Sequence, residues 1–548
     1  MAEPNRKSDG ASGPKLACLT FFSLIYCALI MFTAARFEVT IGHQRLYVLP
    51  DDVMITLRTA YNFAQGLGPY FNPQERVQAA TSLFYPLLVS PLFKVFSQSD
   101  AVLALICLST AAVLGLFLLL TLFSRNVSSL TVSLALLVFC PSLLTYGPTA
   151  WEHVPQAGLV TLGFLLFLGQ RPVFLLGETW SEVLGVLCLS LAFLIRPDAA
   201  VLLIVPGLWL FRRFLKSKSA ADLAVLTILM LFCLSYILAG LYYYDQVLPN
   251  SWYLKAGAGA ATLKDGFTYF FRTIIKGGNT TFLLALWFLL FSKSLAWSAK
   301  DKAVVLSISL FAAYVIYLGG DVFSQGRFFL AVTPTIVFLI AEKTTILATS
   351  GFRTVPRPAA AVIFILLCVL PPASLIDFAL TVSAPGRSRG RAAAEGKCLP
   401  DPKAAQLSLS PIIREKVRPA DGDLGLFYLG ALSFYLPEFQ ATDFLGRADP
   451  VIARRPARPG PIGHNKWDFD YSLSRRRVAV IPMFELSRKE AEKQVEEQRD
   501  FNFWAELVLH PVIQSRYRYL SAAELGLNHH WGLYVRKDLV DRFRPAPP

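Results

Sequence analysis

Long apolar blocks separated by short polar stretches run through the chain up to about residue 380. A transmembrane helix needs about 20 mostly apolar residues. The candidate blocks are 16–36, 81–97, 101–123, 127–147, 154–170, 177–195, 198–212, 221–241, 280–296, 302–319, 328–343 and 358–380. The block 81–97 is interrupted by Pro86, Pro91 and Lys94, so we expect that it does not cross the bilayer. The pattern predicts a polytopic α-helical membrane protein with about 11 transmembrane helices.

Basic residues predict the orientation of these helices. They cluster at Arg212–Lys218, Lys293–Lys302 and Lys343–Arg357, and the positive-inside rule assigns these loops and the N-terminus to the cytoplasm. With the N-terminus in the cytoplasm, an even number of membrane crossings must precede Arg212–Lys218. This condition is met when the block 81–97 is not counted as a crossing. The polar stretches 37–80 and 242–279, the turn Gly319–Arg327 and the segment after about residue 380 are then expected on the outer face.

The segment after residue 380 has the pattern of a soluble domain. Strand-like runs occur at Leu424–Leu429 and Val478–Met483, and helical patterns at Ser487–Glu497 and Asn502–Leu509. This mixture predicts a small α/β or α+β domain. We therefore expect a membrane domain over residues 1–380, whose outer loop 37–100 carries interfacial helices, and a soluble outer domain over 381–548.

Composition and charge narrow the class of protein. Hydrophobic residues make up 54% of the chain and charged residues 16%, with a mean hydropathy of +0.48. Soluble proteins carry about 25% charged residues, so this composition argues against a soluble enzyme. The net charge of +14 points, in a membrane protein, to anionic lipid headgroups or a phosphate-bearing substrate rather than to nucleic acid. Of the 8 cysteines, only Cys398 lies in polar sequence, and none has zinc-ligand spacing.

Five polar motifs lie at the expected outer ends of the helices, where an ionisable residue needs a partner or a function. They are Leu49–Arg58 (LPDDVMITLR), Thr149–His153 (TAWEH), Ile195–Asp198 (IRPD), Tyr242–Lys255 (YYYDQVLPNSWYLK) and Leu318–Phe328 (LGGDVFSQGRF). If the topology holds, all five converge on one outward-facing cavity. Each motif also has a structural interpretation, such as helix capping, an Arg–Asp turn or an aromatic belt at the membrane interface.

Outward carboxylates together with arginines suit the transfer of a group from a lipid-linked phosphate. The cations would neutralise the leaving phosphate, and a carboxylate would take the proton of an acceptor hydroxyl. Asp51 and Asp52 could instead bind Mg²⁺ or Mn²⁺, and a mechanism with a base alone is equally compatible with these residues. A transporter of a lipid-linked sugar is the alternative, but it would require charges along a path across the bilayer and inverted repeats.

Taken jointly, the motifs resemble those of the GT-C polyprenyl-phosphate-dependent glycosyltransferases. The chain looks most like the arabinofuranosyltransferases related to the mycobacterial enzyme that adds terminal β-(1→2) arabinofuranose. In these, the first outer loop reads approximately DDAMIxxRxAxNLAxGxG, which Asp51–Gly68 matches closely, and Gln78–Ser82 (QAATS) replaces the family's EGYTN. Arg196–Ala199 is similar to RPDG, and Asp443–Lys466 resembles the family's D-x-x-G-x-x-D and G-H-x-K signature.

The resemblance implies a decaprenyl- or undecaprenyl-phosphate arabinofuranose donor and a periplasmic active site in a bacterial inner membrane. Asp51 or Asp52 would be the general base. The phosphate ligands would be Arg58, Arg196, Lys255 and Arg327, and the groups that position sugar or acceptor would be Glu152, Asp198, Asp245, Asn250, Tyr253, Asp321 and His464. The acceptor would be a pilin Ser or Thr, as in the pilin arabinosyltransferases, or a cell-envelope polysaccharide. Mannose and aminoarabinose stay open as alternative sugars.

Overall fold

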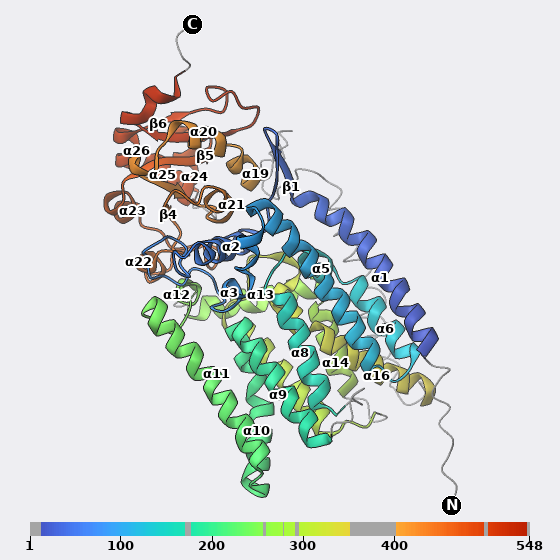
Figure 1. Cartoon of the computed structure of the whole chain (residues 1–548). Coiled ribbons are helices and arrows are strands. Elements are labelled where there is room, and N and C mark those ends of the chain that lie inside the picture. Colours follow the sequence, from blue (N-terminus) through green and yellow to red (C-terminus); the bar gives the residue numbers. More distant parts are fainter. Residues whose placement is uncertain are drawn as a thin grey trace, which may run out of the picture. The chain divides into compact units, whose positions relative to one another are not determined.

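The computed structural model (Figure 1) describes residues 12–169, 177–255, 259–277, 279–290, 295–350, 402–497 and 502–544. These residues form two compact units. The first comprises 12–36, 104–236 and 260–350, and the second comprises 37–103, 237–259 and 402–544. The predicted boundary near residue 380 lies outside the described residues. The second unit contains, besides the C-terminal segment, the two stretches 37–103 and 237–259, which the sequence assigned to the membrane domain.

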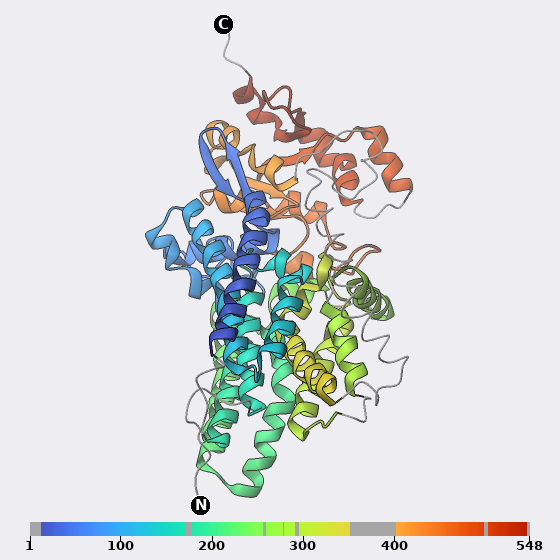
Figure 2. The ribbon, with the colours of Figure 1, turned by 90° about the vertical axis from the view of Figure 1, so that its right-hand side faces the viewer.

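The first unit is built of helices. Their bounds are α1 (Ser12–Ala34), α5 (Gln98–Phe123), α6 (Val127–Val138), α7 (Pro141–Tyr146), α8 (His153–Phe167), α9 (Glu178–Ile195), α10 (Ala200–Ser217), α11 (Ala220–Tyr244), α13 (Gly259–Gly277), α14 (Asn279–Leu290), α15 (Ala299–Tyr317) and α16 (Thr333–Ser350). Helix α1 packs beside α6, as both views show (Figures 1 and 2). Helices α8 and α9 approach closely because Gly163 and Gly185 lie at their contact, where a Cβ on Gly185 would come 2.6 Å from the Gly163 carbonyl oxygen.

Three helices of the described residues are long and apolar enough to cross a membrane: Gly13–Phe37, Gln98–Phe123 and Ala220–Tyr244. Two bent helix pairs would raise the number to five, each counted as one span. The block 81–97 forms only the short helices α3 (Tyr85–Val89) and α4 (Leu92–Val95), which are far below the length of a span. The predicted span 358–380 lies outside the described residues. A polytopic helical membrane fold is thus confirmed, and the number of 11 spans stays a prediction.

The second unit contains a hairpin of β1 (Glu38–Ile41) and β2 (Gln44–Tyr47) and a five-stranded mixed sheet in the order β4-β3-β5-β7-β6. Strand β3 is parallel to β4 and β5, whereas β7 is antiparallel to β5 and β6. The predicted strands and helices of the C-terminal segment are found as β3, β5, α24 and α25. The elements are β3 (Asp423–Leu426), β4 (Ala441–Asp443), β5 (Val478–Phe484), β6 (Tyr517–Leu520), β7 (Trp531–Arg536), α2 (Asp51–Ala64), α12 (Asn250–Lys255), α19 (Pro402–Leu407), α20 (Ser410–Lys416), α21 (Gly430–Tyr435), α22 (Pro450–Ala453), α23 (Phe469–Arg475), α24 (Arg488–Glu496), α25 (Phe503–Leu509) and α26 (Pro511–Arg516).

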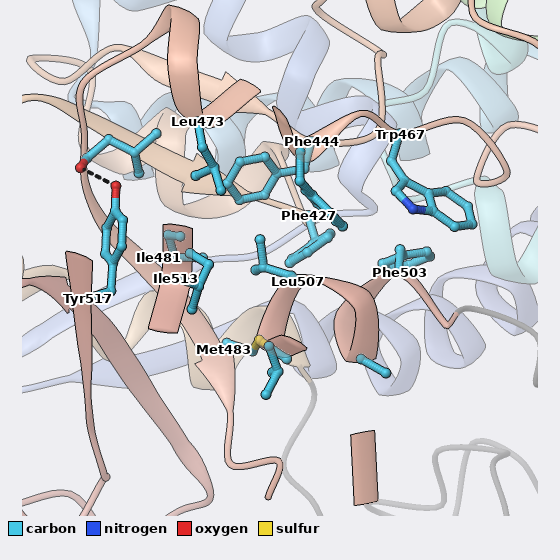
Figure 3. Close-up of a cluster of buried hydrophobic side chains, with 14 of the residues drawn as sticks. Phe427, Phe444, Trp467, Leu473, Ile481, Met483, Phe503, Leu507, Ile513 and Tyr517 are labelled. Carbon is cyan, nitrogen blue, oxygen red and sulfur yellow. Dashed lines mark hydrogen bonds between the residues drawn. The ribbon is translucent and has the colours of Figure 1, made fainter. Parts of the chain in front are cut away.

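An aromatic core on this sheet positions two loops (Figure 3). Phe427 follows β3 and Phe444 follows β4, and their rings lie 5.1 Å apart between centroids. Phe427 also stacks on Phe503 of α25 at 5.2 Å. Because β3 and β4 are parallel, the loops 427–430 and 444–449 leave the sheet at the same edge. That edge carries the groups that contact the start of α2.

Candidate active site

Asp51 and Asp52 form the first turn of α2, as predicted from Pro50 and the two carboxylates. Pro50 is the N-cap residue, and its carbonyl oxygen accepts the first backbone bonds of the helix, from Val53 at 2.9 Å and Met54 at 3.1 Å. Both aspartate side chains bind groups outside the helix. Helix capping is therefore not a sufficient explanation of this pair.

Asp51 contacts the start of α21. The backbone N–H of Gly430 donates to Asp51 Oδ1 at 2.7 Å. A side chain at position 430 could not fit, because its Cβ would lie 2.5 Å from the Asp51 carbonyl oxygen. Burial raises the pKa of the Asp51 carboxyl, and the Gly430 hydrogen bond and the charge of Lys403 oppose this rise. A raised pKa makes the ionised carboxylate a stronger base.

Asp52 forms an ion pair with Arg447, whose Nη2 lies 2.8 Å from Asp52 Oδ1. Both side chains are largely buried, with 13% of Asp52 and 16% of Arg447 exposed. Arg447 lies in the loop after β4, where Asp443 accepts hydrogen bonds from the backbone of Leu445 at 2.8 Å and Ala448 at 2.5 Å. Burial raises the pKa of Asp443 to about 6. No role for Arg447 was predicted from the sequence, although Arg447 lies inside the Asp443–Asp449 motif.

Asn250 holds the same loop from α12. Its Nδ2 donates to the carbonyl oxygens of Gly446 at 2.8 Å, Arg447 at 3.1 Å and Asp449 at 3.2 Å. Asn250, a predicted site residue, is thus hydrogen-bonded to the loop that carries Arg447, the partner of Asp52.

Three further predicted residues are Tyr253 and Lys255, which belong to α12, and His464. The Arg454 guanidinium lies 4.0 Å from the ring centre of Tyr253, and Lys466 Nζ donates to the Tyr253 carbonyl oxygen at 2.9 Å. Lys255 is the neighbour of Gly463, where a Cβ would come 3.9 Å from Lys255 Cε. His464 follows directly in the chain. Lys255 and the segment of His464 are therefore brought together.

Two predicted residues of the second unit have other surroundings. Asp245 is exposed and pairs with Arg76 at 3.2 Å. Arg58 is 0% exposed, and its guanidinium donates to the carbonyl oxygens of Phe71 at 2.8 Å, Phe439 at 2.7 Å and Ser433. This geometry favours a structural role for Arg58 over the predicted role as a phosphate ligand, because its donors are directed at buried carbonyls.

The first unit contains a buried cluster made of all five predicted residues of that unit. Arg196 Nη1 pairs with Glu152 Oε1 at 2.7 Å and its Nη2 with Asp198 Oδ2 at 3.0 Å. Arg327 pairs with Asp321. The Phe328 ring lies close to both guanidinium groups, at 5.6 Å from Arg196 and 5.5 Å from Arg327. The convergence of all five motifs on one cavity stays a prediction.

The formal charge of this cluster is −1, since three carboxylates face two guanidinium groups. Trp151 and Phe323 add aromatic faces, each with its ring centre 4.3 Å from the Arg327 guanidinium. In this arrangement both arginines have carboxylate partners. The ion pairs therefore hold the side chains of the cluster in fixed orientations. The cluster does not by itself offer an excess of positive charge to a phosphate.

The residues at Asp51 and Asp52 do not fit a dedicated metal site. One carboxylate binds a backbone N–H and the other an arginine. Within the described ranges, no group of three His, Cys, Asp or Glu side chains could hold a metal ion.

Comparison with known proteins supports the resemblance at the level of the fold. No protein-family model matches the chain. A segment of 111 residues is 36% identical to the terminal β-(1→2)-arabinofuranosyltransferase of Corynebacterium glutamicum, which covers 20% of this chain and only 15% of that relative.

Two solved structures are similar over nearly the whole chain. ArnT from Cupriavidus metallidurans bound to undecaprenyl phosphate matches with a TM-score of 0.52 and 11% identity, over 96% of this chain and 99% of that one. The Archaeoglobus fulgidus oligosaccharyltransferase in the apo form has a TM-score of 0.49 and 12% identity, over 95% and 74%. The fold of the chain is therefore similar to that of ArnT.

Proposed function

We propose that the protein is a membrane glycosyltransferase that moves arabinofuranose from a polyprenyl-phosphate donor to an acceptor hydroxyl. The observation that carries this proposal is the pair Asp51 and Asp52 at the start of α2, held by Gly430 and Arg447. The likeness to ArnT, whose structure contains undecaprenyl phosphate, supports a lipid-phosphate donor. The match to an arabinofuranosyltransferase supports the sugar.

Asp51 is the general base in this proposal. Gly430 holds Oδ1 in place, and the second carboxylate oxygen takes the proton of the acceptor hydroxyl as that hydroxyl attacks the anomeric carbon. Because burial raises the pKa of Asp51, its carboxylate accepts a proton more readily than an exposed aspartate would.

Arg447 stabilises the leaving phosphate, and Asp52 holds the guanidinium in position. A guanidinium binds two phosphate oxygens in a planar geometry, which suits the charge that develops as the bond to the sugar breaks. Lys255 is a second cation of the same unit that was predicted for this role. Aminoarabinose or mannose as the sugar, and a pilin or a polysaccharide as the acceptor, are the alternatives that the experiment below separates. The proposed location is the inner membrane, with the active site on the periplasmic face.

The test uses the purified full-length protein in lipid nanodiscs with synthetic polyprenyl-phosphoryl arabinofuranose, aminoarabinose and mannose. Release of polyprenyl phosphate is measured with an arabinan oligosaccharide or a pilin peptide as the acceptor. We expect Asp51→Asn to lower the rate about 10²–10⁴-fold, the usual contribution of a general base. Asp541→Asn is the matched control, because Asp541 is highly exposed and pairs only with Arg544 among the contacts described.

Different outcomes contradict different parts of the proposal. If the wild type releases polyprenyl phosphate only from the aminoarabinose or mannose donor, the sugar is wrong and the reaction class stands. If Asp52→Asn abolishes transfer while Asp51→Asn does not, the two aspartates have exchanged roles. Absence of release from all three donors would reject the transferase.

A further inference from the structure

Between residues 262 and 274, helix α13 has three different faces. With about 100° per residue, Leu263, Phe267 and Phe271 form one stripe, and their side chains are 44%, 51% and 58% exposed. We call this stripe the apolar face. The adjoining sector is also exposed, and we call it the charged face, made of Lys264, Asp265, Thr268 and Arg272. The remaining sector is buried in the protein and contains Thr262, Gly266, Tyr269, Phe270 and Thr273.

The buried sector fixes α13 across the end of α15. A Cβ on Gly266 would overlap the carbonyl group of Ile316, the last residue but one of α15. A Cβ on Gly320, just after α15, would likewise overlap Tyr269 of α13. Helix α13 therefore packs on the C-terminal end of α15 and on the turn Gly319–Arg327 that follows it.

Helix α13 runs nearly perpendicular to the helix that follows it in the chain. The segments Thr262–Ile274 and Asn279–Leu290 are bent by 87°. Helices α14 and α15 correspond to the predicted spans 280–296 and 302–319. A helix that is perpendicular to one span and packs on the end of another lies parallel to the bilayer, at its surface. Tyr317, the last residue of α15, is 64% exposed, as is typical of tyrosines at a membrane–water interface.

We propose that α13 is an interfacial helix, with its apolar face among the acyl chains of the bilayer and its charged face at the lipid headgroups. The leaflet is the outer one in the predicted orientation. Contact with acyl chains removes the exposed Leu263, Phe267 and Phe271 side chains from water. Lys264 and Arg272 outweigh the one carboxylate of the charged face, which complements the phosphates of the headgroups. This inference does not depend on the proposed sugar transfer.

The position of α13 has a consequence for the buried cluster of the first unit. Arg272 Nη2 donates to the Asp321 carbonyl oxygen at 3.3 Å, and the Asp321 carboxylate pairs with Arg327. Helix α13 thus contacts the turn that carries both residues of this ion pair. Lipid contacts of α13 therefore set the depth of the ion pair relative to the bilayer surface.

The test measures the membrane depth of α13 in the full-length protein in phosphatidylcholine nanodiscs. One residue at a time is replaced by p-acetylphenylalanine, which accepts a nitroxide spin label without reaction at the native cysteines. The labelled positions are the three of the apolar face and, as matched exposed controls, Lys264, Thr268 and Arg272. Power saturation with O₂, which concentrates among acyl chains, and with a water-soluble nickel chelate gives the depth of each label. Leu231 in the span Ala220–Tyr244 and the highly exposed Asp541 are the lipid and water references.

We expect the labels on the apolar face to lie about 5–10 Å below the phosphates, at nearly equal depth, and to collide with O₂ as the Leu231 label does. The labels on the charged face should lie at the phosphates or above them and collide more with the nickel chelate. A second measurement needs no substitution. In the wild type, hydroxyl radicals formed in water should oxidise the half-exposed Phe267 no faster than Phe427, which is 7% exposed.

Three results would overturn the proposal. A depth that changes steadily from position 263 to position 271, by about 1.5 Å per residue, would show that α13 is part of a bent span. Low accessibility of the apolar face to both reagents would show that another segment of protein covers it. High accessibility to the nickel chelate at position 267, with rapid oxidation of Phe267 in the wild type, would show that this face is in water.

Discussion

At the scale of single residues, the second unit uses buried charged side chains to join segments that are far apart in sequence. Arg58 is the clearest example, because its guanidinium donates to carbonyl oxygens at Phe71, Ser433 and Phe439. Asp443 acts within its own loop. It accepts hydrogen bonds from two backbone N–H groups, and these bonds shape the loop of Arg447. Because both side chains bind protein backbone groups, we expect both residues to act on the site through those groups.

Arg58→Met should destabilise the second unit by about 3 kcal/mol, because several buried carbonyl oxygens lose a charged donor. Thermal unfolding of the purified protein measures this change. Arg544→Met is the control, since Arg544 is largely exposed and pairs with Asp541, and exposed pairs contribute little. An Arg58→Met protein that keeps its stability but no longer binds polyprenyl phosphate would restore the phosphate-binding role predicted from the sequence.

Asp443 should make stability depend on pH. Its folded pKa of about 6 lies above the ordinary value of 3.8 because of burial, so the folded state binds this proton more tightly than the unfolded state. The resulting stabilisation is complete below about pH 4 and is lost as the pH rises through about 6. The wild type should therefore lose on the order of 1–3 kcal/mol relative to Asp443→Asn between pH 4 and pH 7. Equal pH dependence of the two melting temperatures would contradict this assignment.

At the scale of elements, the candidate site depends on the parallel pairing of β3 and β4. This pairing brings the loops 427–430 and 444–449 to one edge of the sheet, and the start of α2 binds both through Asp51 and Asp52. The contact of α2 with α21 is tight because position 430 has no side chain. A shift of α21 would move the Gly430 N–H away from Asp51.

Gly430→Ala should therefore affect both stability and transfer. The added Cβ would come 2.5 Å from the Asp51 carbonyl oxygen and 2.7 Å from Met54 Cβ, and overpacking of this kind costs about 1–3 kcal/mol. We expect a lower melting temperature and at least a tenfold lower kcat. Gly158→Ala in α8 is the control, because a Cβ there meets nothing within 4 Å and alanine favours the helix. A Gly430→Ala protein with wild-type kcat would show that the Gly430 contact does not position the base.

At the scale of the whole molecule, each unit is assembled from separate stretches of chain. The second unit combines residues 37–103, 237–259 and 402–544. The hydrogen bonds between Asn72 and Ala441, and between Tyr47 and Tyr435, join the first of these stretches to the last. We therefore expect the C-terminal segment to depend on the first stretch for part of its packing.

The fragment 402–548 should consequently be less stable than the same residues in the full-length protein. Without 37–103 it loses the partners of α21, and the buried Leu432 and Phe434 become exposed. Hydrogen exchange should show faster exchange of the α21 amides in the fragment, with the protection of β5 largely kept because its core partners are present. Equal protection of α21 in the fragment and in the full-length protein would support the predicted independent domain 381–548.

The sequence by itself determined the local features of this protein. Pro50 followed by Asp51 and Asp52 predicts the start of α2, and the apolar run at Val478–Met483 predicts a buried strand. These features depend on residues that are close in the chain, where periodicity and capping preferences act directly. The apolar blocks likewise predict a polytopic membrane fold through their length.

The tertiary structure alone decided which groups these elements meet. Arg58 and Asp51 lie on the same helix, α2, yet Arg58 binds carbonyl oxygens 375 and 381 residues away, and Asp51 binds the Gly430 N–H 379 residues away. Arg447, for which the sequence predicted no role, is the partner of Asp52. Hydrogen-bond partners at such separations are chosen by the pairing of β3 and β4 and by the packing of α2 on α21. No local pattern of hydrophobic and polar residues encodes that choice.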